Sequence, residues 1–266
     1  ANPQPLGVAA QIVPWNFPLM MLSWKIAPAL AAGNTVVLKP AESTPLTALL
    51  FAEVCQQAEL PDGVVNIVTG FGDTGAALVA HKDVDKVAFT GSTEVGKLIA
   101  KQVAGSGKKV TLELGGKAAN IVFDDAPIDQ AVEGVINGIF FNQGHVCCAG
   151  SRLLVQESIH DEFMRKLKRR MNSLRLGDPM DKNTDVGAIN SSDQLKKINS
   201  MVKAGIKEGG QLCQPECKLP KNGFWFVPSV IENVSPANTV VREEIFGPVL
   251  SVLTFRTPDE AIAKAN

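Results

Sequence analysis

Short apolar runs alternate with helical patterns through the first 113 residues, and this alternation limits the fold more than any other feature. The runs consist of Val, Ile and Ala rather than of alternating apolar and polar residues, which is typical of strands covered on both faces. Strands that alternate with helices form a parallel sheet. We expect strands at residues 7–13, 35–38, 64–68, 86–90 and 109–114, and helices at 18–32, 45–60, 74–81 and 94–103.

Helix caps are visible in the sequence as well. Thr44 is expected to cap the second helix, with Pro45 in its first turn. Ser191 and Gln194 have the spacing of a capping box, in which each side chain bonds the other residue's backbone.

Gly115-Gly116 forms a natural hinge to a second α/β stretch, so we place one domain at residues 1–114 and another at 115–266. In the second domain the sequence favours strands at 119–123, 152–155, 226–231 and 249–255. It favours helices at 129–140, 158–174, from about Ser191 onward, and at 258–266. The chain opens without Met and stops inside the last of these helices, which leads us to expect a piece of a longer protein.

The composition excludes several classes of function. Twenty-six basic and 27 acidic residues give a formal charge of −1, too small a field to attract nucleic acid or an anionic membrane. Every candidate apolar run is interrupted before it reaches the length a bilayer requires, and no signal peptide is visible. The odd number of five cysteines favours free thiols and a reducing, cytoplasmic compartment.

A glycine-bearing segment follows the strand expected at residues 86–90 and opens a helix. In Gly91-Ser92-Thr93-Glu94-Val95-Gly96, free backbone N–H groups and the positive helix end are expected to face an anion such as a diphosphate. The segment is not the G-x-G-x-x-G fingerprint, and a plain β–α turn with a glycine-rich tip is the alternative.

Lys39-Pro40-Ala41-Glu42 ends another expected strand, at the edge where open parallel sheets bind ligands. The Glu42 carboxylate can accept both hydroxyls of a ribose, and Lys39 can donate to one of them. Because Glu42 would repel a 2′-phosphate, the pair favours NAD over NADP. A surface ion pair at a helix entrance is the alternative.

The stretch Phe140-Phe141-Asn142-Gln143-Gly144-His145-Val146-Cys147-Cys148-Ala149-Gly150-Ser151-Arg152 is the most specific in the chain. It resembles the cysteine signature of the aldehyde dehydrogenases, although His145 stands where Gln or Glu is more common. Other segments resemble that family in the same order, from Gly7 to the last residue. They are Pro14-Trp15-Asn16-Phe17-Pro18, Lys39 to Glu42, Gly91 to Gly96, Thr111-Leu112-Glu113-Leu114-Gly115-Gly116-Lys117 and Glu243-Glu244-Ile245-Phe246-Gly247-Pro248.

The resemblance implies the catalytic residues. By position Cys147 corresponds to the nucleophile and Cys148 to its inert neighbour, although a lone cysteine is more often a small buried hydrophobe. Asn16 would donate to the oxyanion together with the Cys147 backbone N–H. Glu113 would be the general base, with a pKa that partial burial must raise. Asn16 could alternatively cap the helix that follows it.

The resemblance also implies a Rossmann-like cofactor domain, followed by a catalytic α/β domain, in an incomplete aldehyde dehydrogenase fold. It places Glu244 on the nicotinamide ribose and Phe246 beside the nicotinamide. The full set of expected cofactor-binding residues is Ile12, Trp15, Lys39, Glu42, Gly91, Ser92, Gly96, Leu114, Glu244 and Phe246. The cofactor is NAD, and NADP is disfavoured by Glu42.

The expected function is oxidation of an aldehyde to a carboxylic acid with NAD. A CoA-acylating enzyme is one alternative, which Glu113 argues against, and a catalytically incompetent or truncated homologue is another. We expect no nucleic acid or membrane partner and a homo-oligomeric parent protein, a dimer or a tetramer. We place Cys213 and Cys217 in a polar loop. No His or further Cys lies close to them in the sequence, so no metal site is expected.

Overall fold

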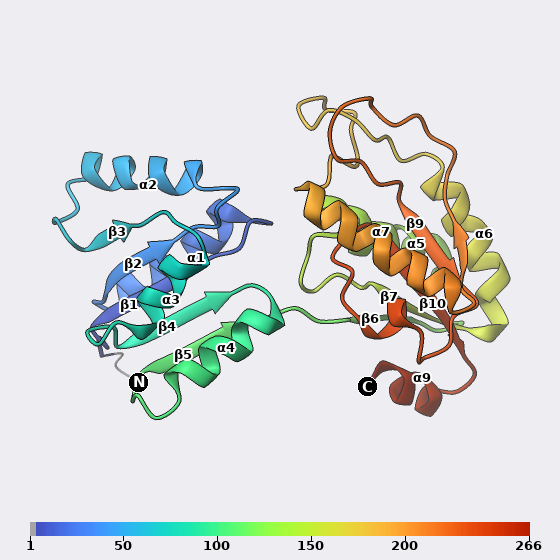
Figure 1. Cartoon of the computed structure of the whole chain (residues 1–266). Helices are drawn as coiled ribbons and strands as arrows, with labels where there is room; N and C mark the ends of the chain where they lie inside the picture. Colours follow the sequence, from blue (N-terminus) through green and yellow to red (C-terminus); the bar gives the residue numbers. More distant parts are fainter. Residues whose placement is uncertain (1–3) are drawn as a thin grey trace. The chain divides into compact units, whose positions relative to one another are not determined.

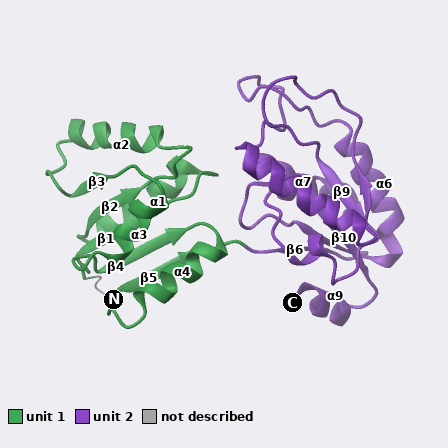
Figure 2. Ribbon diagram, in the orientation of Figure 1, with its two compact units in different colours: residues 1–115 green, residues 116–266 purple. Residues whose placement is uncertain are grey.

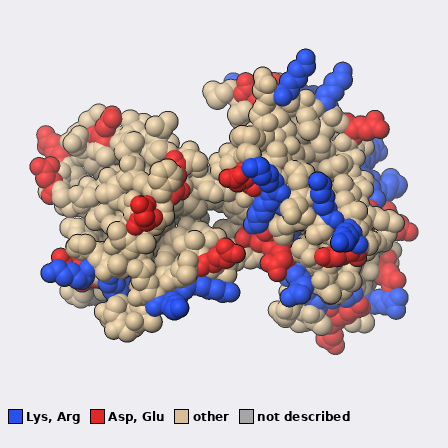
Figure 3. All heavy atoms as spheres, viewed as in Figure 1, with Lys and Arg blue, Asp and Glu red and all other residues tan. Residues whose placement is uncertain are grey.

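A computed structural model describes residues 4–266 of the chain. The chain divides into two compact units, residues up to Gly115 and residues from Gly116 onward (Figure 2). On the face seen in Figure 3, acidic and basic side chains both occur on each unit, in line with the small net charge. Each unit is an α/β structure with its own core, and each is described by itself below.

The first unit holds a five-stranded sheet in which all strands run parallel, in the order β3-β2-β1-β4-β5. Along the chain the strands are β1 (Val8–Ile12), β2 (Thr35–Lys39), β3 (Val65–Ile67), β4 (Lys86–Thr90) and β5 (Lys109–Glu113). Every strand end lies within 1 residue of its predicted position. The predicted parallel, Rossmann-like sheet is confirmed.

Helices cover both faces of this sheet (Figure 1). They are α1 (Pro18–Ala31), α2 (Leu46–Gln57), α3 (Gly72–Ala80) and α4 (Thr93–Val103). Leu22 and Ile26 of α1 pack on one side with Val36 and Leu38, whereas Ile99 of α4 packs in the core of the other side. The prediction that Thr44 caps α2 is wrong. The carbonyl of Pro45 accepts the first helical hydrogen bonds from Ala48 and Leu49, so the cap lies one residue later.

The pairing register brings the carboxyl ends of four strands to one edge of the sheet. Ile12 pairs with Lys39 on one side and with Phe89 on the other, and Thr90 pairs with Glu113. Between β1 and β4 the strand order changes direction, and open parallel sheets bind ligands at such a switch point. The segments after β1, β2, β4 and β5, which carry the predicted site residues of this unit, therefore begin at one edge.

The second unit contains a mixed sheet in the order β6-β7-β10-β9-β8. Its strands are β6 (Ala119–Val122), β7 (Arg152–Gln156), β8 (Gln211–Cys213), β9 (Ser229–Glu232) and β10 (Val249–Phe255). Only β8 among these pairs antiparallel, with β9. The expectation that Cys213 sits in a polar loop is wrong, because Cys213 ends β8 and packs against the core. A three-residue strand is too short for its alternation to show in the sequence.

Helices on both faces of this sheet enclose two further core clusters (Figure 1). Phe163 and Leu167 lie in one cluster, and Ile198 and Val202 lie in the other. The α-helices are α5 (Ile128–Phe140), α6 (His160–Met171), α7 (Ser192–Lys207), α8 (Thr239–Arg242) and α9 (Pro258–Ala265). The helix predicted at 158–174 is instead a short 3-10 turn, Glu157–Ile159, followed by α6.

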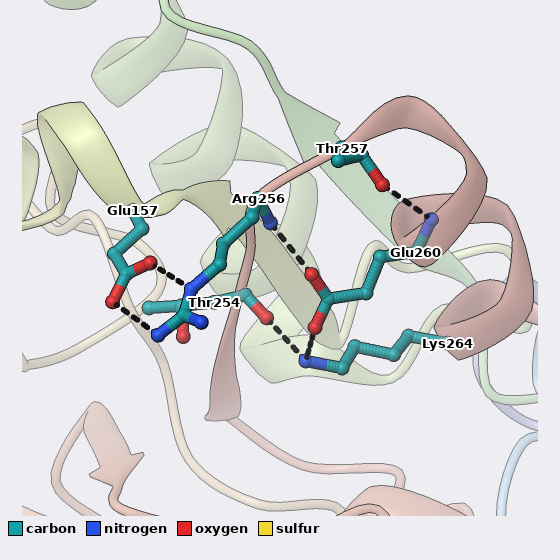
Figure 4. A network of polar contacts seen from close by, with 6 residues as sticks. All are labelled: Glu157, Thr254, Arg256, Thr257, Glu260 and Lys264. Carbon is teal, nitrogen blue, oxygen red and sulfur yellow. Dashed lines mark hydrogen bonds and ion pairs between the residues drawn. The ribbon is translucent and has the colours of Figure 1, made fainter.

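A polar network fastens α9 to β10 (Figure 4). The Thr257 hydroxyl accepts a hydrogen bond from the Glu260 N–H at 3.3 Å, and the Glu260 carboxylate accepts one from the Arg256 N–H at 2.8 Å. Lys264 Nζ donates to the carbonyl of Thr254 at 2.7 Å and pairs with Glu260. Because the groups of this network are accessible to solvent, water screens their attraction, and the core clusters provide the main stabilisation.

Candidate active site

Lys39 and Glu42 form the best-defined polar pair of the first unit. Lys39 is buried, and its Nζ donates to the Pro40 carbonyl at 3.0 Å and to Glu42 Oε1 at 2.9 Å. Partial desolvation acts to raise the pKa of Glu42, but the hydrogen bond and charge of Lys39 and a backbone hydrogen bond outweigh it and hold that pKa below its ordinary value. Glu42 is therefore an ionised, exposed carboxylate that can accept hydrogen bonds.

A cavity of about 260 Å³ adjoins this pair. It lies beyond the carboxyl ends of β2 and β3, and the segments that follow these two strands line it. Its lining residues are Pro40, Ala41, Glu42, Pro45, Thr69, Gly70 and Phe71. A concave, mostly apolar site with one fixed carboxylate has the character of a small-molecule site.

The Gly91–Gly96 segment differs in part from its prediction. The Gly91 N–H donates to the Glu113 carbonyl at 3.0 Å, so this group does not face an anion. The Ser92 hydroxyl caps α4 by accepting from the Val95 N–H at 3.3 Å. A Cβ on Gly96 would lie 2.4 Å from the Leu114 side chain. Packing of α4 against β5 thus explains Gly96, and the prediction of a free N–H is wrong for Gly91 because the β4–β5 ladder extends to it.

Asn16 is half-buried and follows β1. The helix after it begins at Pro18 with Phe17 in the N-cap position, so the alternative that Asn16 caps this helix is wrong. Trp15 and Ile12, two of the predicted cofactor contacts, are also half-buried.

Glu113 ends β5 with an exposed side chain, so the expected partial burial is wrong. The physical reason is position: β5 is an edge strand, and most of its residues are exposed. Sequence reasoning missed Lys25 on α1. Burial lowers the pKa of Lys25, and the charge of Glu113 acts in the opposite direction, which places the two groups within electrostatic range.

In the second unit, the loop that carries Cys147 has an unusual backbone. Asn142, Gln143 and Gly144 have positive φ values of 47°, 55° and 72° in succession. At Gly144 the loop lies so close to Gly247 that a Cβ would be 2.2 Å from the Gly247 carbonyl oxygen. This backbone contact joins the Cys147 loop to the segment that holds Glu244 and is invisible in the sequence.

The Cys147 thiol is exposed, as is its neighbour Cys148. Its pKa nevertheless lies above the usual value, first because the surrounding protein partly desolvates it and then because of the adjacent Cys148. The thiol form therefore predominates at neutral pH, and a base is needed to generate the nucleophilic thiolate.

His145 is a buried residue whose place in the site could not be read from the sequence. Its ring stacks on that of Phe246, with centroids 5.7 Å apart and an interplanar angle of 29°. Burial lowers the pKa of His145 to about 4, so the imidazole is neutral at neutral pH. An apolar stack therefore links the Cys147 loop to Phe246.

Gln194 supports the Phe246 segment from α7. Its Nε2 donates to the carbonyls of Ile245 at 3.2 Å and Phe246 at 2.7 Å. Ser191 does accept the Gln194 N–H at 3.2 Å, so the capping half of the predicted box is confirmed. The reciprocal half is wrong, because the Gln194 amide is used on these carbonyls instead.

Glu244 is hydrogen-bonded to Gly116, the first residue of the second unit. The Gly116 N–H donates to Glu244 Oε1 at 3.3 Å. Burial raises the pKa of Glu244, while the Gly116 hydrogen bond and the charges of Lys197 and Lys117 act against this rise.

The close backbone contact makes Gly144 a sensitive position. Gly144→Ala is expected to lower the free energy of unfolding by about 2 to 4 kcal/mol, because the new Cβ adds left-handed strain to a clash with Gly247. Thermal unfolding should then shift down by roughly 5 to 10 °C. Gly134→Ala is the matched control, since a Cβ there meets nothing and alanine favours the α5 helix. Equal melting temperatures of the two variants would contradict the contact.

Other kinds of site find little support in residues 4–266. No group of three or more His, Cys, Asp or Glu residues in that range is arranged to hold a metal ion, and all five cysteines are free thiols. Within the described part of the chain, no helix combines the length and the apolarity needed to cross a bilayer.

Comparison with known proteins gives a consistent result. The sequence model of the Aldehyde dehydrogenase family matches residues 1–266. Retinal dehydrogenase 2 of Taeniopygia guttata is 51% identical over 268 residues, which cover 99% of this chain and 51% of that protein. The mitochondrial aldehyde dehydrogenase of Homo sapiens is 49% identical over 265 residues, covering 99% of this chain and 51% of that protein.

Solved structures agree. The NAD⁺ complex of aldehyde dehydrogenase from Bacillus cereus has a TM-score of 0.95 at 46% identity, covering 99% of this chain and 54% of that one. The NAD-dependent aldehyde dehydrogenase from Sinorhizobium meliloti has a TM-score of 0.96 at 45% identity, and the match covers 98% of this chain and 52% of that one. The fold is thus that of a dehydrogenase. The chain belongs to the aldehyde dehydrogenase family, and it spans about half the length of the curated relatives it matches.

Proposed function

We propose that the protein containing this chain oxidises an aldehyde to a carboxylic acid with NAD, through a covalent intermediate on Cys147. The observation that carries the proposal is the exposed Cys147 thiol in a loop locked onto the Glu244–Phe246 segment. Membership of the aldehyde dehydrogenase family supports the reaction class. The two units are proposed to be the cofactor domain and the catalytic domain.

The residues of the chain fit the cofactor. The cavity beside the Lys39–Glu42 pair offers an ionised carboxylate to the two hydroxyls of a ribose, and a relative from Bacillus cereus is known as an NAD⁺ complex. When bound, NAD accepts a hydride from the substrate carbon. Glu244 and Phe246 are proposed to hold the nicotinamide end of NAD. The remainder of the cofactor is proposed to contact Ile12, Trp15, Lys39, Glu42, Gly96 and Leu114. For Gly91 and Ser92 we propose only that they lie close to the cofactor, since the Gly91 N–H and the Ser92 hydroxyl both take part in hydrogen bonds within the protein.

The chemistry begins with the Cys147 thiolate adding to the aldehyde carbon, which turns the carbonyl oxygen into an oxyanion. Asn16 and the Cys147 backbone N–H are proposed to donate to that oxygen, and losing one such donor typically raises a barrier by about 3 to 4 kcal/mol. When the oxyanion reforms the carbonyl, the hydride leaves and a thioester remains on Cys147. Glu113 then takes a proton from water, which adds to the thioester, and the acid and the thiol are released.

A direct assay tests this function. NADH formation by the native polypeptide that carries this sequence should require both NAD and an aldehyde, and the carboxylic acid should accumulate in equal amount. The panel should include retinal, because one relative is named retinal dehydrogenase, together with aliphatic and aromatic aldehydes. Turnover that depends on CoA would favour an acylating enzyme, and NAD binding without turnover would favour a catalytically incompetent homologue.

Cofactor choice should depend on Glu42. Glu42→Ala is expected to weaken NAD binding about tenfold, because a hydrogen-bonded charged acceptor is lost, and to lessen discrimination against NADP by a larger factor, because repulsion of the 2′-phosphate is also lost. Calorimetric Kd values for both nucleotides measure this. Glu53→Ala, which removes an exposed carboxylate from the neighbouring α2, is the control. An unchanged ratio of the two Kd values in Glu42→Ala would contradict the assignment of Glu42 as the residue that selects NAD over NADP.

Two further expectations stay predictions. The compartment was expected to be the cytoplasm, but relatives include proteins named mitochondrial, so cell fractionation is the test. The homo-oligomeric state is tested by sedimentation of the native polypeptide.

A further inference from the structure

Lys117 is a lysine whose amine is buried without an acceptor. It follows the Gly115-Gly116 hinge, and its Nζ has no hydrogen-bond partner within residues 4–266. Removing an ammonium group from water without pairing it is costly, and lysines are rarely buried in this way. The Lys117 amine has no role in the proposed reaction steps.

The backbone around Lys117 is held on both sides. Arg152 Nε donates to the Lys117 carbonyl at 2.9 Å, and the other guanidinium nitrogens donate to the carbonyls of Lys264 at 3.1 Å and Ala265 at 2.7 Å. Just before Lys117, the Gly116 N–H donates to the Glu244 carboxylate at 3.3 Å. Residues 116 and 117 are therefore fixed between the start of β7 and Glu244.

The charges facing Lys117 come from Arg152 at the start of β7 and from Glu244 in the segment between α8 and β10. Burial, and then the nearby Arg152 guanidinium, lower the pKa of Lys117 to about 7, while Glu244 acts to raise it. For Glu244, burial raises the pKa, and Gly116, Lys197 of α7 and Lys117 act to lower it. The amine and the carboxylate each favour the charged form of the other.

We propose that Lys117 is a positioning residue for Glu244, whose charged amine keeps the half-buried carboxylate ionised so that it stays on the Gly116 N–H. Through the role of Glu244 in cofactor binding, this proposal rests on the proposed function. An ionised carboxylate accepts hydrogen bonds from ribose hydroxyls better than a protonated one. Lys117 would thus influence NAD binding through Glu244 without needing to contact NAD.

The charges of Lys117 and Glu244 determine how NAD affinity should change with pH when the amine is removed. Below about pH 7 the Lys117 amine is charged and opposes protonation of Glu244. Because burial raises the pKa of Glu244, this carboxyl group takes up its proton at a higher pH than an ordinary glutamate does. Without the amine, Glu244 should take up its proton at a higher pH, and NAD affinity should begin to fall at that higher pH.

The test measures the titration of Glu244 directly. In the native polypeptide labelled with ¹³C at glutamate side-chain carboxyls, the Glu244 signal is assigned by its loss in Glu244→Gln. Lys117→Met, which keeps the apolar stem and removes the amine, is expected to raise the pKa of Glu244 measurably. Lys117→Arg retains a cation and should leave that pKa near the wild-type value. Lys203→Met, an exposed lysine on α7, is the matched control and should change nothing.

The outcomes separate this proposal from the proposed function. An unchanged Glu244 pKa in folded Lys117→Met, with the fold checked by thermal unfolding, overturns the positioning role. So does a rise equal to that of Lys203→Met. NAD affinity is then measured by calorimetry from pH 5 to 8. A raised Glu244 pKa with an NAD affinity profile that does not move supports the role of Lys117 but removes Glu244 from the proposed cofactor site. If Lys117→Arg fails to fold, Lys117→Met against Lys203→Met still decides.

Discussion

Cys147→Ala is expected to lower kcat for aldehyde oxidation by at least roughly 10⁴-fold, because the proposed thioester forms on the Cys147 sulfur. NAD affinity should stay nearly unchanged, since the side chain is small and the Cys147 loop is fixed elsewhere. The anchors are the Gly144–Gly247 contact and the His145–Phe246 stack, neither of which involves the sulfur. Steady-state NADH production and calorimetry of NAD binding measure the two effects separately.

Cys148→Ala provides the matched control for this prediction. Cys148 is adjacent and also exposed, so its replacement by alanine is a chemically identical change next to the proposed nucleophile. Its loss also removes one of the causes that raise the pKa of the Cys147 thiol, which makes a small gain in thiolate possible but not a large loss of rate. Equal damage from the two substitutions would show that the nucleophile has been assigned to the wrong residue.

Glu113→Gln is expected to slow steady-state turnover by about 10²- to 10⁴-fold, the usual contribution of a general base. The thioester should form before the base becomes essential, so NADH should appear in a burst of about one equivalent per site and then stall. Glutamine keeps the size of the side chain and its exposed position at the end of β5, which makes loss of folding an implausible explanation for the effect.

Stopped-flow absorbance of NADH distinguishes the possible roles of Glu113. A burst followed by a slow phase places the residue in hydrolysis of the thioester. Loss of the burst itself would show that Glu113 is needed earlier, when the Cys147 thiol gives up its proton. That thiol has a raised pKa and so depends on a base. Unaltered turnover would remove Glu113 from the mechanism. Thr111→Val, a change at an exposed position of the same strand, is the control.

Local patterns predicted regular structure well where the pattern is long. β4 and β10 lie at the predicted residues, because a run of Val, Ile, Leu and Phe between turn residues leaves little choice. β8 was missed, since three residues carry no period. The helix cap at Thr44 was also wrong, because the first helical carbonyl belongs to Pro45. Small shifts of this kind depend on packing around the helix end.

The candidate site shows the same division. The motifs around Cys147 and Glu244 suffice to nominate these residues, because particular side chains in a particular order define the family. The burial and the neighbours of the site residues could not be predicted from these motifs. Glu113 is exposed because β5 is an edge strand, and His145 is buried because its ring packs on Phe246, a residue 101 positions away.

Residue patterns alone were enough to identify the family and the parallel sheet of the first unit, and to nominate residues for the proposed chemistry. These depend on side-chain type and on periodicity, both of which are local properties of the chain. Only the tertiary structure decided that Gly144 lies on Gly247, that Gln194 holds the carbonyls of the Phe246 segment, and that the Lys117 amine is buried near Glu244. Contacts between segments far apart in the chain set burial and charge environment, and these set pKa values.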